Sequence, residues 1–320
     1  MIRILFIAAL ISTLGFSIFG QGNRVSHPLL GRENPNYLNP AFSGSEMQPR
    51  VILSYGANSI IFSKSTNSIV TSKNLSASFD TYIPALRGGL GVRANFVGSE
   101  GQVNGAPFSF VNLSYSPKIS SAKKITLAPV MDIGIDRVVY GDQSEYYLNS
   151  GMGTLINTKK SHAGIFHAID WLESEHQHNT RAHIGHRFDL SKKMKLGFES
   201  QYIRESRRNQ NTHNFTSHSF QFTSNFSYQK IKVTAGVYKD VIEQSFRYDY
   251  ASDISKLTPM LGLGYHTDQF SIHGNLILPR TRELNFPYYF LLAEHEFTPI
   301  NYQTESTFEI AIGYTFQEKE

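Results

Sequence analysis

The feature that most constrains this chain is an alternation of apolar and polar side chains with a period of two, which recurs along most of its length. In NLSASFDTY, Leu75, Ala77 and Phe79 share one face, and serine and aspartate occupy the other. This is the side-chain period of a β-strand, so the sequence predicts an all-β fold. Equivalent apolar faces recur downstream at Leu90, Val92, Ala94 and Phe96, at Ile125, Leu127, Met131, Ile133 and Ile135, at Met194, Leu196 and Phe198, at Phe220, Phe222, Phe226 and Tyr228, at Ile231, Val233, Ala235 and Val237, and at Phe308, Ile310, Ile312, Tyr314 and Phe316.

The connections between these segments indicate which kind of β protein the chain forms. A membrane-spanning barrel needs segments of about ten residues, apolar toward lipid and polar toward the lumen. A soluble β-sandwich or a lipocalin-like barrel also alternates. Here short connections such as ALR, NTKK and QK mostly alternate with long ones such as ESRRNQNTHN, and outer-membrane barrels have short periplasmic turns and longer extracellular loops. We therefore predict a transmembrane antiparallel outer-membrane β-barrel.

The alternating segments predict about 14 strands, within a range of about 12 to 16, because the long region before the last strand can supply more. We place the barrel at residues 50–316, after an irregular N-terminal periplasmic segment at 21–49 and before a polar tail at 317–320. An even strand number puts both ends of the barrel in the periplasm. The expected strands are 50–62, 72–83, 87–98, 106–117, 124–138, 147–156, 161–170, 179–190, 193–205, 216–228, 231–240, 257–267, 269–279 and 305–316.

The first 20 residues have the pattern of a secretory signal peptide. Arg3 precedes an apolar run at Ile4–Phe19, and the small residue Gly20 ends it, so we expect cleavage before Gln21. A transmembrane helix is the alternative, but about 16 apolar-rich residues are short for a membrane span. We therefore expect residues 1–20 to direct secretion through the inner membrane, and the barrel to reside in the outer membrane.

Composition excludes several other classes of protein. The chain has no cysteine, which excludes disulfides and a lipoprotein anchor. Its formal net charge is only +4 and its basic residues are scattered, so nucleic acid is not an expected partner. No second stretch is apolar enough to cross a bilayer as a helix. We expect contact with outer-membrane lipid and no cofactor.

Residues 34–46, NPNYLNPAFSGSE, differ from everything that follows them. Pro35 and Pro40 lack a backbone donor and push the preceding asparagines toward extended geometry, so the segment is a poor helix and a poor interior strand. Gly44 favours a turn before the first strand near Arg50, and the apolar side chains of the segment need burial. The sequence predicts an irregular lead-in packed against the periplasmic mouth of the barrel.

A set of segments along the chain resembles one known family. These are NPNYLNPAFSGS, ASFDTYI, GGLGVRANF at Gly88–Phe96, GMGTLINTKKSHAGIFHAI at Gly151–Ile169 and FEIAIGYTF at Phe308–Phe316. Together they resemble the PorP/SprF family of type IX secretion membrane proteins found in Bacteroidetes, with Asn39–Gly44 as the distinctive core. On this resemblance, a structural signature at the periplasmic mouth comprises Asn34, Pro35, Tyr37, Asn39, Pro40, Ala41, Phe42, Ser43 and Gly44.

The resemblance implies a function and partners without enzymatic chemistry. Such a barrel would take part in protein secretion and gliding motility, binding or anchoring adhesin-like surface proteins by their C-terminal sorting domains and contacting periplasmic type IX components. An exposed apolar loop is the expected docking surface, because such runs usually meet a partner. An extra strand or a plug in the lumen is the alternative interpretation. The loop consists of Phe286, Pro287, Tyr288, Tyr289, Phe290, Leu291 and Leu292.

A histidine-rich region at residues 162–186 has side chains that suit zinc or a similar ion. However, the sequence has no HExxH motif, and His183 and His186, three apart in a strand, point to opposite faces. We therefore expect lumen or loop histidines here. Without a G-x-S-x-G motif, no enzyme is predicted either. The region contains His162, His167, His176, His178, His183 and His186, with Glu173 and Glu175 nearby.

An outer-membrane diffusion channel for small solutes is the alternative function. The predicted lumen face carries polar and charged side chains, which suit a water-filled passage. The same groups could pair with one another in a closed interior, because a barrel of this size can be filled by side chains, loops or a plug. The resemblance favours secretion, and the residues alone leave both open. The lumen side chains are Arg93, Asp132, Asp136, Lys195, Glu199 and Gln201.

Overall fold

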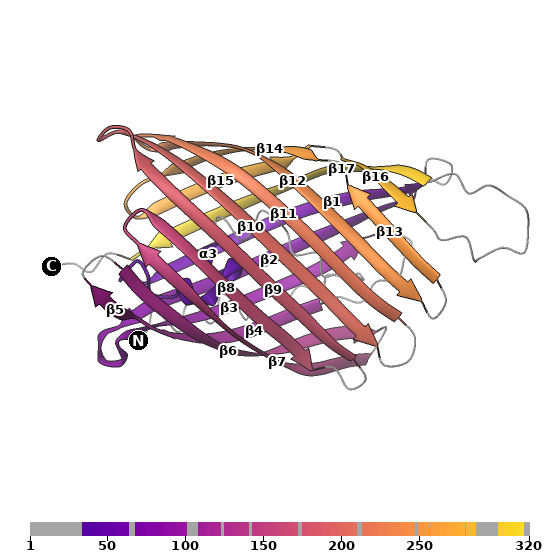
Figure 1. Ribbon diagram of the computed structural model, residues 1–320, viewed down its shortest axis with the longest axis horizontal. Coiled ribbons are helices and arrows are strands. Elements are labelled where there is room, and N and C mark those ends of the chain that lie inside the picture. Colours follow the sequence, from indigo (N-terminus) through magenta and orange to yellow (C-terminus); the bar gives the residue numbers. More distant parts are fainter. Residues whose placement is uncertain are drawn as a thin grey trace, which may run out of the picture.

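Every alternating segment of the sequence becomes part of one antiparallel sheet (Figure 1). The computed structural model describes residues 34–63, 68–100, 108–122, 125–140, 143–171, 175–209, 213–246, 249–255, 257–278, 280–285 and 300–316. The strands are β1 (Arg50–Ser63), β2 (Ser68–Ile83), β3 (Gly88–Glu100), β4 (Phe108–Pro117), β5 (Ile119–Ala122), β6 (Ile125–Tyr140), β7 (Gln143–Thr158), β8 (Ser161–Trp171), β9 (Glu175–Asp189), β10 (Met194–Asn209), β11 (His213–Tyr228), β12 (Ile231–Phe246), β13 (Asp249–Ser255), β14 (Thr258–His266), β15 (Phe270–Ile277), β16 (Arg280–Asn285) and β17 (Ile300–Thr315).

The sheet closes because its first and last strands pair with each other. β1 pairs with β2 on one side and with β17 on the other, with Arg50 opposite Thr315 at one end of the contact. Three of the barrel strands are each divided into two labelled pieces that share a neighbour. These pieces are β4 and β5, which both pair with β6, β13 and β14, which both pair with β12, and β15 and β16, which both pair with β17. The described residues therefore form a closed barrel of 14 strands, which confirms the predicted strand number.

The two faces of the wall differ sharply in polarity. In β6, Met131 and Ile133 point outward and are 76% and 59% exposed. Asp132 and Asp136 of the same strand point inward and are 4% and 2% exposed. The last strand repeats this pattern. A wall that is apolar outside and polar inside is the pattern of a transmembrane barrel, whose outer band contacts lipid. The protein is thus an outer-membrane β-barrel, as the alternation predicts.

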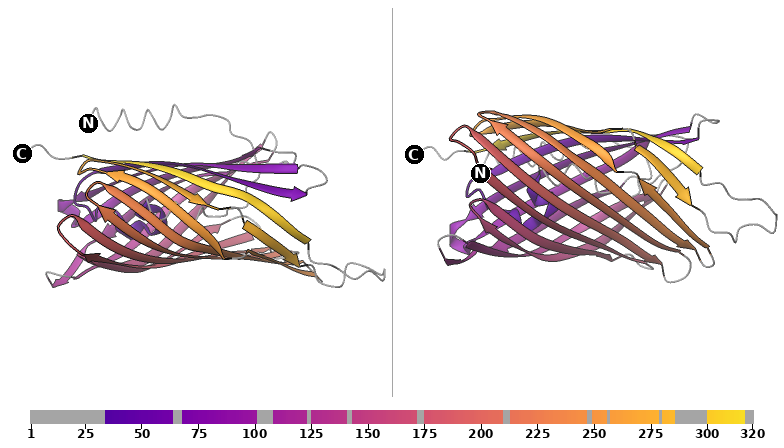
Figure 2. Two further views of the ribbon diagram at one scale, coloured as in Figure 1. Left: turned by 90° about the horizontal axis from the view of Figure 1, so that it is seen from above. Right: turned by 45° about the horizontal axis from the view of Figure 1, so that its top comes forward.

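The N-terminal segment lies inside the barrel, toward the end where the short turns are (Figures 1 and 2). It contains a one-turn helix, α3 (Pro35–Leu38), and a 3-10 turn, η1 (Pro40–Phe42); a second 3-10 turn, η2 (Pro84–Leu86), joins β2 to β3. The expectation of a wholly irregular segment is therefore wrong in detail, because proline is well tolerated at the first position of a helix. In the described part of the chain, no helix has the length and apolar character needed to cross a membrane.

The depth dependence of a charge on the outer face tests this orientation. Ile133 lies near the middle of β6 and Ile125 at its short-turn end, and both are exposed. We expect Ile133→Arg to lower the free energy of unfolding in lipid vesicles by about 2–4 kcal/mol and the matched control Ile125→Arg by about 0–1 kcal/mol. Urea titrations of the two variants in vesicles measure this difference, and equal costs would contradict the membrane span.

Candidate functional site

The N-terminal segment Asn34–Gly44 fills part of the lumen with side chains that are almost all inaccessible to water. Asn36, Asn39 and Ser43 are fully buried, and Asn34 is 1% exposed. Buried polar groups are costly unless they are hydrogen-bonded, so this segment depends on polar partners from the barrel wall.

Asp80 on β2 is the principal partner in the wall. Its carboxylate is fully buried and accepts hydrogen bonds from Asn36 Nδ2 at 2.6 Å and from the backbone N–H of Gly44 at 2.9 Å. Arg50 Nε at the start of β1 forms an ion pair with the same carboxylate at 3.0 Å. One side chain of the wall therefore holds both the helical turn and the end of the segment, and ties them to the first strand.

Asn39 has a second anchoring role in the middle of the segment. Its Oδ1 accepts from the backbone N–H of Ala41 at 3.0 Å and so caps η1. Its Nδ2 donates to the backbone carbonyl of Thr154 on β7 at 3.1 Å and lies 3.2 Å from Nε2 of His183 on β9. The segment is thus bound to the opposite part of the wall as well.

Further wall groups bind the segment through both its backbone and its side chains. Arg181 on β9 donates to the carbonyl of Tyr37, and its guanidinium lies over the Tyr37 ring, 5.2 Å from the ring centroid. Lys118, between β4 and β5, donates through Nζ to the carbonyl of Ala41 at 2.6 Å. Ser78 on β2 donates to Asn34 Oδ1 at 3.0 Å.

The apolar side chains of the segment pack on a small apolar patch of the wall. Ala41 is fully buried in this patch, and Phe42 packs against it. The Phe42 ring also contacts two histidines, with centroid distances of 5.4 Å to His162 and 5.2 Å to His183. The wall side of the patch consists of Ala128, Val130, Leu155 and Phe166, with Ala168 beside them.

Two glycines of β3 make room for the end of the segment. A Cβ atom at Gly89 would lie 1.8 Å from the carbonyl oxygen of Ser43, and one at Gly91 would lie 2.2 Å from Ser43 Oγ. Gly44 itself has φ +68°, a conformation that glycine adopts without steric cost. Gly89 and Gly91 are therefore required by the close approach of the segment. Sequence reasoning missed this role, although two lumen-facing glycines next to the first hairpin were a usable signal.

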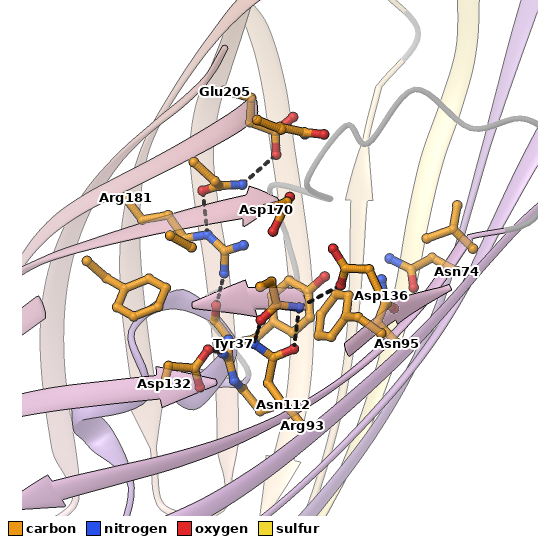
Figure 3. Close-up of a pocket in the computed structure, with 17 residues that line it drawn as sticks. Tyr37, Asn74, Arg93, Asn95, Asn112, Asp132, Asp136, Asp170, Arg181 and Glu205 are labelled. Carbon is orange, nitrogen blue, oxygen red and sulfur yellow. Dashed lines mark hydrogen bonds and ion pairs between the residues drawn. The ribbon is translucent and has the colours of Figure 1, made fainter. Parts of the chain in front are cut away.

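Beyond the segment, polar side chains form a network along one side of the lumen (Figure 3). Asp132 on β6 accepts from Arg93 Nη2 and from Asn112 Nδ2, each at 2.6 Å. Asn112 also donates to Asn149 Oδ1 at 2.7 Å, and Asn149 donates to Asp136 Oδ1 at 2.6 Å. These groups come from β3, β4, β6 and β7, so the network joins neighbouring strands around one side of the lumen.

A second part of the network lies on β9 and β10. Arg181 Nε donates to Asn179 Oδ1 at 3.0 Å, and Asn179 Nδ2 donates to Glu205 Oε1 at 2.8 Å. Between the two parts lies a cavity of about 80 Å³, and Tyr37 of the segment forms part of its lining. Of the lumen residues predicted from sequence, Arg93, Asp132, Asp136 and Gln201 are buried, Glu199 is half-buried and Lys195 is exposed near the short turn.

The segment does not fill the whole cross-section of the short-turn end. A second cavity of about 270 Å³ lies beside it, between Pro35 and Glu46 on one side and Ser271 and Gly313 of the wall on the other. Among the described residues, the segment's contacts therefore run along β2 to β9, and this cavity lies along β15, β17 and β1.

The histidines are divided among three places. His183 is buried beside the segment, whereas His186 is exposed and forms a hydrogen bond of 2.7 Å with Ser161 Oγ, so the two point to opposite faces as predicted. His167 and His178 lie 3.4 Å apart through their ring nitrogens. Among the residues whose side chains are described, no three groups converge on a metal site. Glu173 and the side chains of Glu175 and His176 lie outside the described residues.

The expected docking loop, Phe286–Leu292, also lies outside the described residues. The residues expected to form a signature at the barrel mouth, from Asn34 to Gly44, are those that the structure brings together in the lumen. Sequence reasoning did not identify their wall partners Asp80, Arg181 and Lys118.

Comparison with known proteins finds similarity in structure only. No family model and no curated protein matches this sequence. Among solved structures, the CymD monoaromatic hydrocarbon channel is 11% identical with a TM-score of 0.47, covering 88% of this chain and 92% of that one. The Ralstonia pickettii toluene transporter TbuX is 10% identical with a TM-score of 0.46, covering 90% and 93%. A Pseudomonas aeruginosa FadL homologue is 9% identical with a TM-score of 0.45, covering 88% and 94%.

The fit between Gly89 and the segment can be tested by labelling. Because the chain has no cysteine, Ser43→Cys gives a single thiol whose reaction with a maleimide reports whether the segment is seated. We expect Gly89→Ala to weaken seating by about 1–3 kcal/mol through overpacking and to speed labelling accordingly. Gly274→Ala is the matched control, since a Cβ there meets no atom within 4 Å. Equal labelling rates in both variants would contradict the close approach.

Proposed function

We propose that the protein is an outer-membrane channel for small solutes whose lumen is closed, in this conformation, by the segment Asn34–Gly44. The observation that carries the proposal is that the closure is made by a segment that pairs with no strand. Side-chain hydrogen bonds and one apolar patch hold it in the lumen. Such a closure can open without breaking the sheet.

The lining of the lumen supports the same proposal. A barrel that served only as a scaffold could fill its interior with apolar side chains, but here the interior carries guanidinium, carboxylate and amide groups beyond the segment. Polar lining is typical of a water-filled passage. The cavity of about 270 Å³ beside the segment leaves part of the short-turn end unfilled. No catalytic step belongs to this proposal.

Removing the carboxylate that holds the segment should open the channel. In Asp80→Ala, Asn36, the Gly44 N–H and Arg50 lose their shared buried acceptor, and losing such a partner is strongly destabilising. We expect the wild type to be silent or to open briefly in planar bilayers, and Asp80→Ala to give steady currents. Asp189→Ala, which removes an exposed carboxylate 3.1 Å from Lys160, is the control and should stay silent. A silent Asp80→Ala barrel that is correctly folded would exclude the channel.

Type IX secretion is a second candidate function. The observation that favours it is that Asn39–Gly44, the core of the resemblance to the PorP/SprF family, contributes fully buried side chains to the closure. On this proposal the closed barrel is an anchor for surface-protein cargo carrying a C-terminal sorting domain, and periplasmic components of the machinery bind it. Its lineage and its link to gliding motility rest on the resemblance alone.

An affinity pull-down from detergent-solubilised envelope separates the two candidates. If the barrel is a secretion component, tagged protein should recover a large surface protein or periplasmic type IX proteins. Deleting residues 286–292 should then reduce recovery of the cargo, because an apolar loop is the expected docking surface. Deleting the equally long, more polar sequence 101–107 is the control. Recovery of the barrel alone would contradict the secretion role and leave the channel.

A further inference from the structure

The outer face of the wall changes from apolar to basic along three neighbouring strands, β10, β11 and β12, which run side by side (Figure 1). From the short-turn end of β10, the outward positions are mostly apolar as far as Tyr202, and the next outward residue is Arg204. The outer faces of β11 and β12 change in the same way, at His218 and at Lys239. An apolar band that ends in basic residues on three adjacent strands marks the edge of the region that contacts lipid chains.

The strand register brings these basic residues close together. Arg204 lies directly opposite His218 on β11 and Thr180 on β9. His178 on β9 is the next outward position after Thr180, away from the short turns. Lys239 on β12 is one outward position nearer to the short turns than the partner of His218. The strands run obliquely to the barrel axis (Figure 1), which brings both residues to about the height of Arg204. We call His178, Arg204, His218 and Lys239 the outer basic patch.

The outer basic patch has no counter-charge among the described side chains. Arg204 and Lys239 are both exposed, and within the described part of the chain neither has a hydrogen-bond or ion-pair partner. The described carboxylates of β9 to β12 lie elsewhere, because Asp189 is at the short-turn end and Glu199 and Glu205 face the lumen. The patch therefore presents two full positive charges and two imidazole rings to an anion.

The patch lies at the height of the lipid head groups. The stretch of β10 from Met194 to Tyr202 has the length of a strand that crosses the hydrocarbon core, about nine to eleven residues. Tyr202 at its end has the position of an aromatic girdle, and its hydroxyl lies 2.7 Å from His218 Nδ1. A charge just beyond such a girdle costs little. Because this end of the strands is opposite the short periplasmic turns, the head groups belong to the outer leaflet.

We infer that the outer basic patch binds the phosphate groups of the outer-leaflet lipid, the lipid A part of lipopolysaccharide. The planar guanidinium of Arg204 matches a phosphate through two parallel hydrogen bonds, and Lys239 adds a second positive charge. The rings of His178 and His218 can supply further N–H donors. Tyr202, next to the patch on the side of the apolar band, contacts the lipid chains. Because the site is on the outer wall, it does not depend on whether the lumen opens.

Native mass spectrometry of the full-length barrel, titrated with lipid in a neutral detergent, tests the site. The probes are diphosphorylated lipid A, the same lipid stripped of its phosphates, and phosphatidylglycerol. We expect diphosphorylated lipid A to bind most tightly, and Arg204→Ala and Lys239→Ala each to weaken its binding about fivefold. Arg204→Lys keeps the charge and should retain most of the affinity. Lys192→Ala is the matched control, because it removes an exposed positive charge from the turn at the short-turn end.

The outcomes distinguish this site from general attraction of lipid to the barrel. Binding that requires the phosphates of lipid A, and that falls in Arg204→Ala and Lys239→Ala but not in Lys192→Ala, supports the inference. Equal affinity in all variants overturns it, and so does equal binding of lipid A without phosphates. Tighter binding of phosphatidylglycerol than of lipid A overturns the assignment to the outer-leaflet lipid.

Discussion

The whole architecture depends on the pairing of β1 with β17. Inside a membrane there is no water to bind free backbone N–H and C=O groups, so a sheet is stable there only if it has no edge. The register from Arg50 opposite Thr315 to Ile60 opposite Thr304 satisfies the first and last strands together. Once the sheet is closed, alternation along each strand assigns every side chain to lipid or to lumen. The closed sheet therefore encloses the polar face of every strand, and this makes the interior of the barrel polar.

Closure at 14 strands also creates the problem that the N-terminal segment solves. A barrel of about eight strands can be filled by its own side chains, whereas a wider one needs a plug, loops or water. Here α3 and η1 fill the short-turn end on one side, and amide and carboxylate networks occupy the lumen beyond them. The segment is bound by side chains, so its stability is separate from that of the sheet.

The sequence predicts the wall much better than the interior. The reason is that the wall follows from a pattern between neighbouring residues, whereas the interior depends on contacts between residues far apart in the sequence. Alternation is a local pattern, so the exposure of Met131 and Ile133 and the burial of Asp132 follow from the sequence of β6 alone. The contact of Asn36 with Asp80 joins residues 44 positions apart, and no local period reports such a contact. Gly89 and Gly91 were a local sign that another backbone approaches β3 closely, and the group that approaches them is Ser43 of the segment.

The buried carboxylate of Asp80 determines how many contacts of the segment are lost when one side chain is removed. Many weak contacts spread over a segment would be lost gradually, but a single buried carboxylate that accepts from Asn36, Gly44 and Arg50 makes several contacts depend on one group. Arg181 and Lys118 donate to backbone carbonyls of the segment, and Asn39 is held separately by the carbonyl of Thr154. On the channel proposal, the cavity beside Pro35, next to β15 and β17, is the space into which the segment would move once Asp80 no longer holds it. The proposal therefore places the hinge on the side of Asp80 and the opening on the side of this cavity.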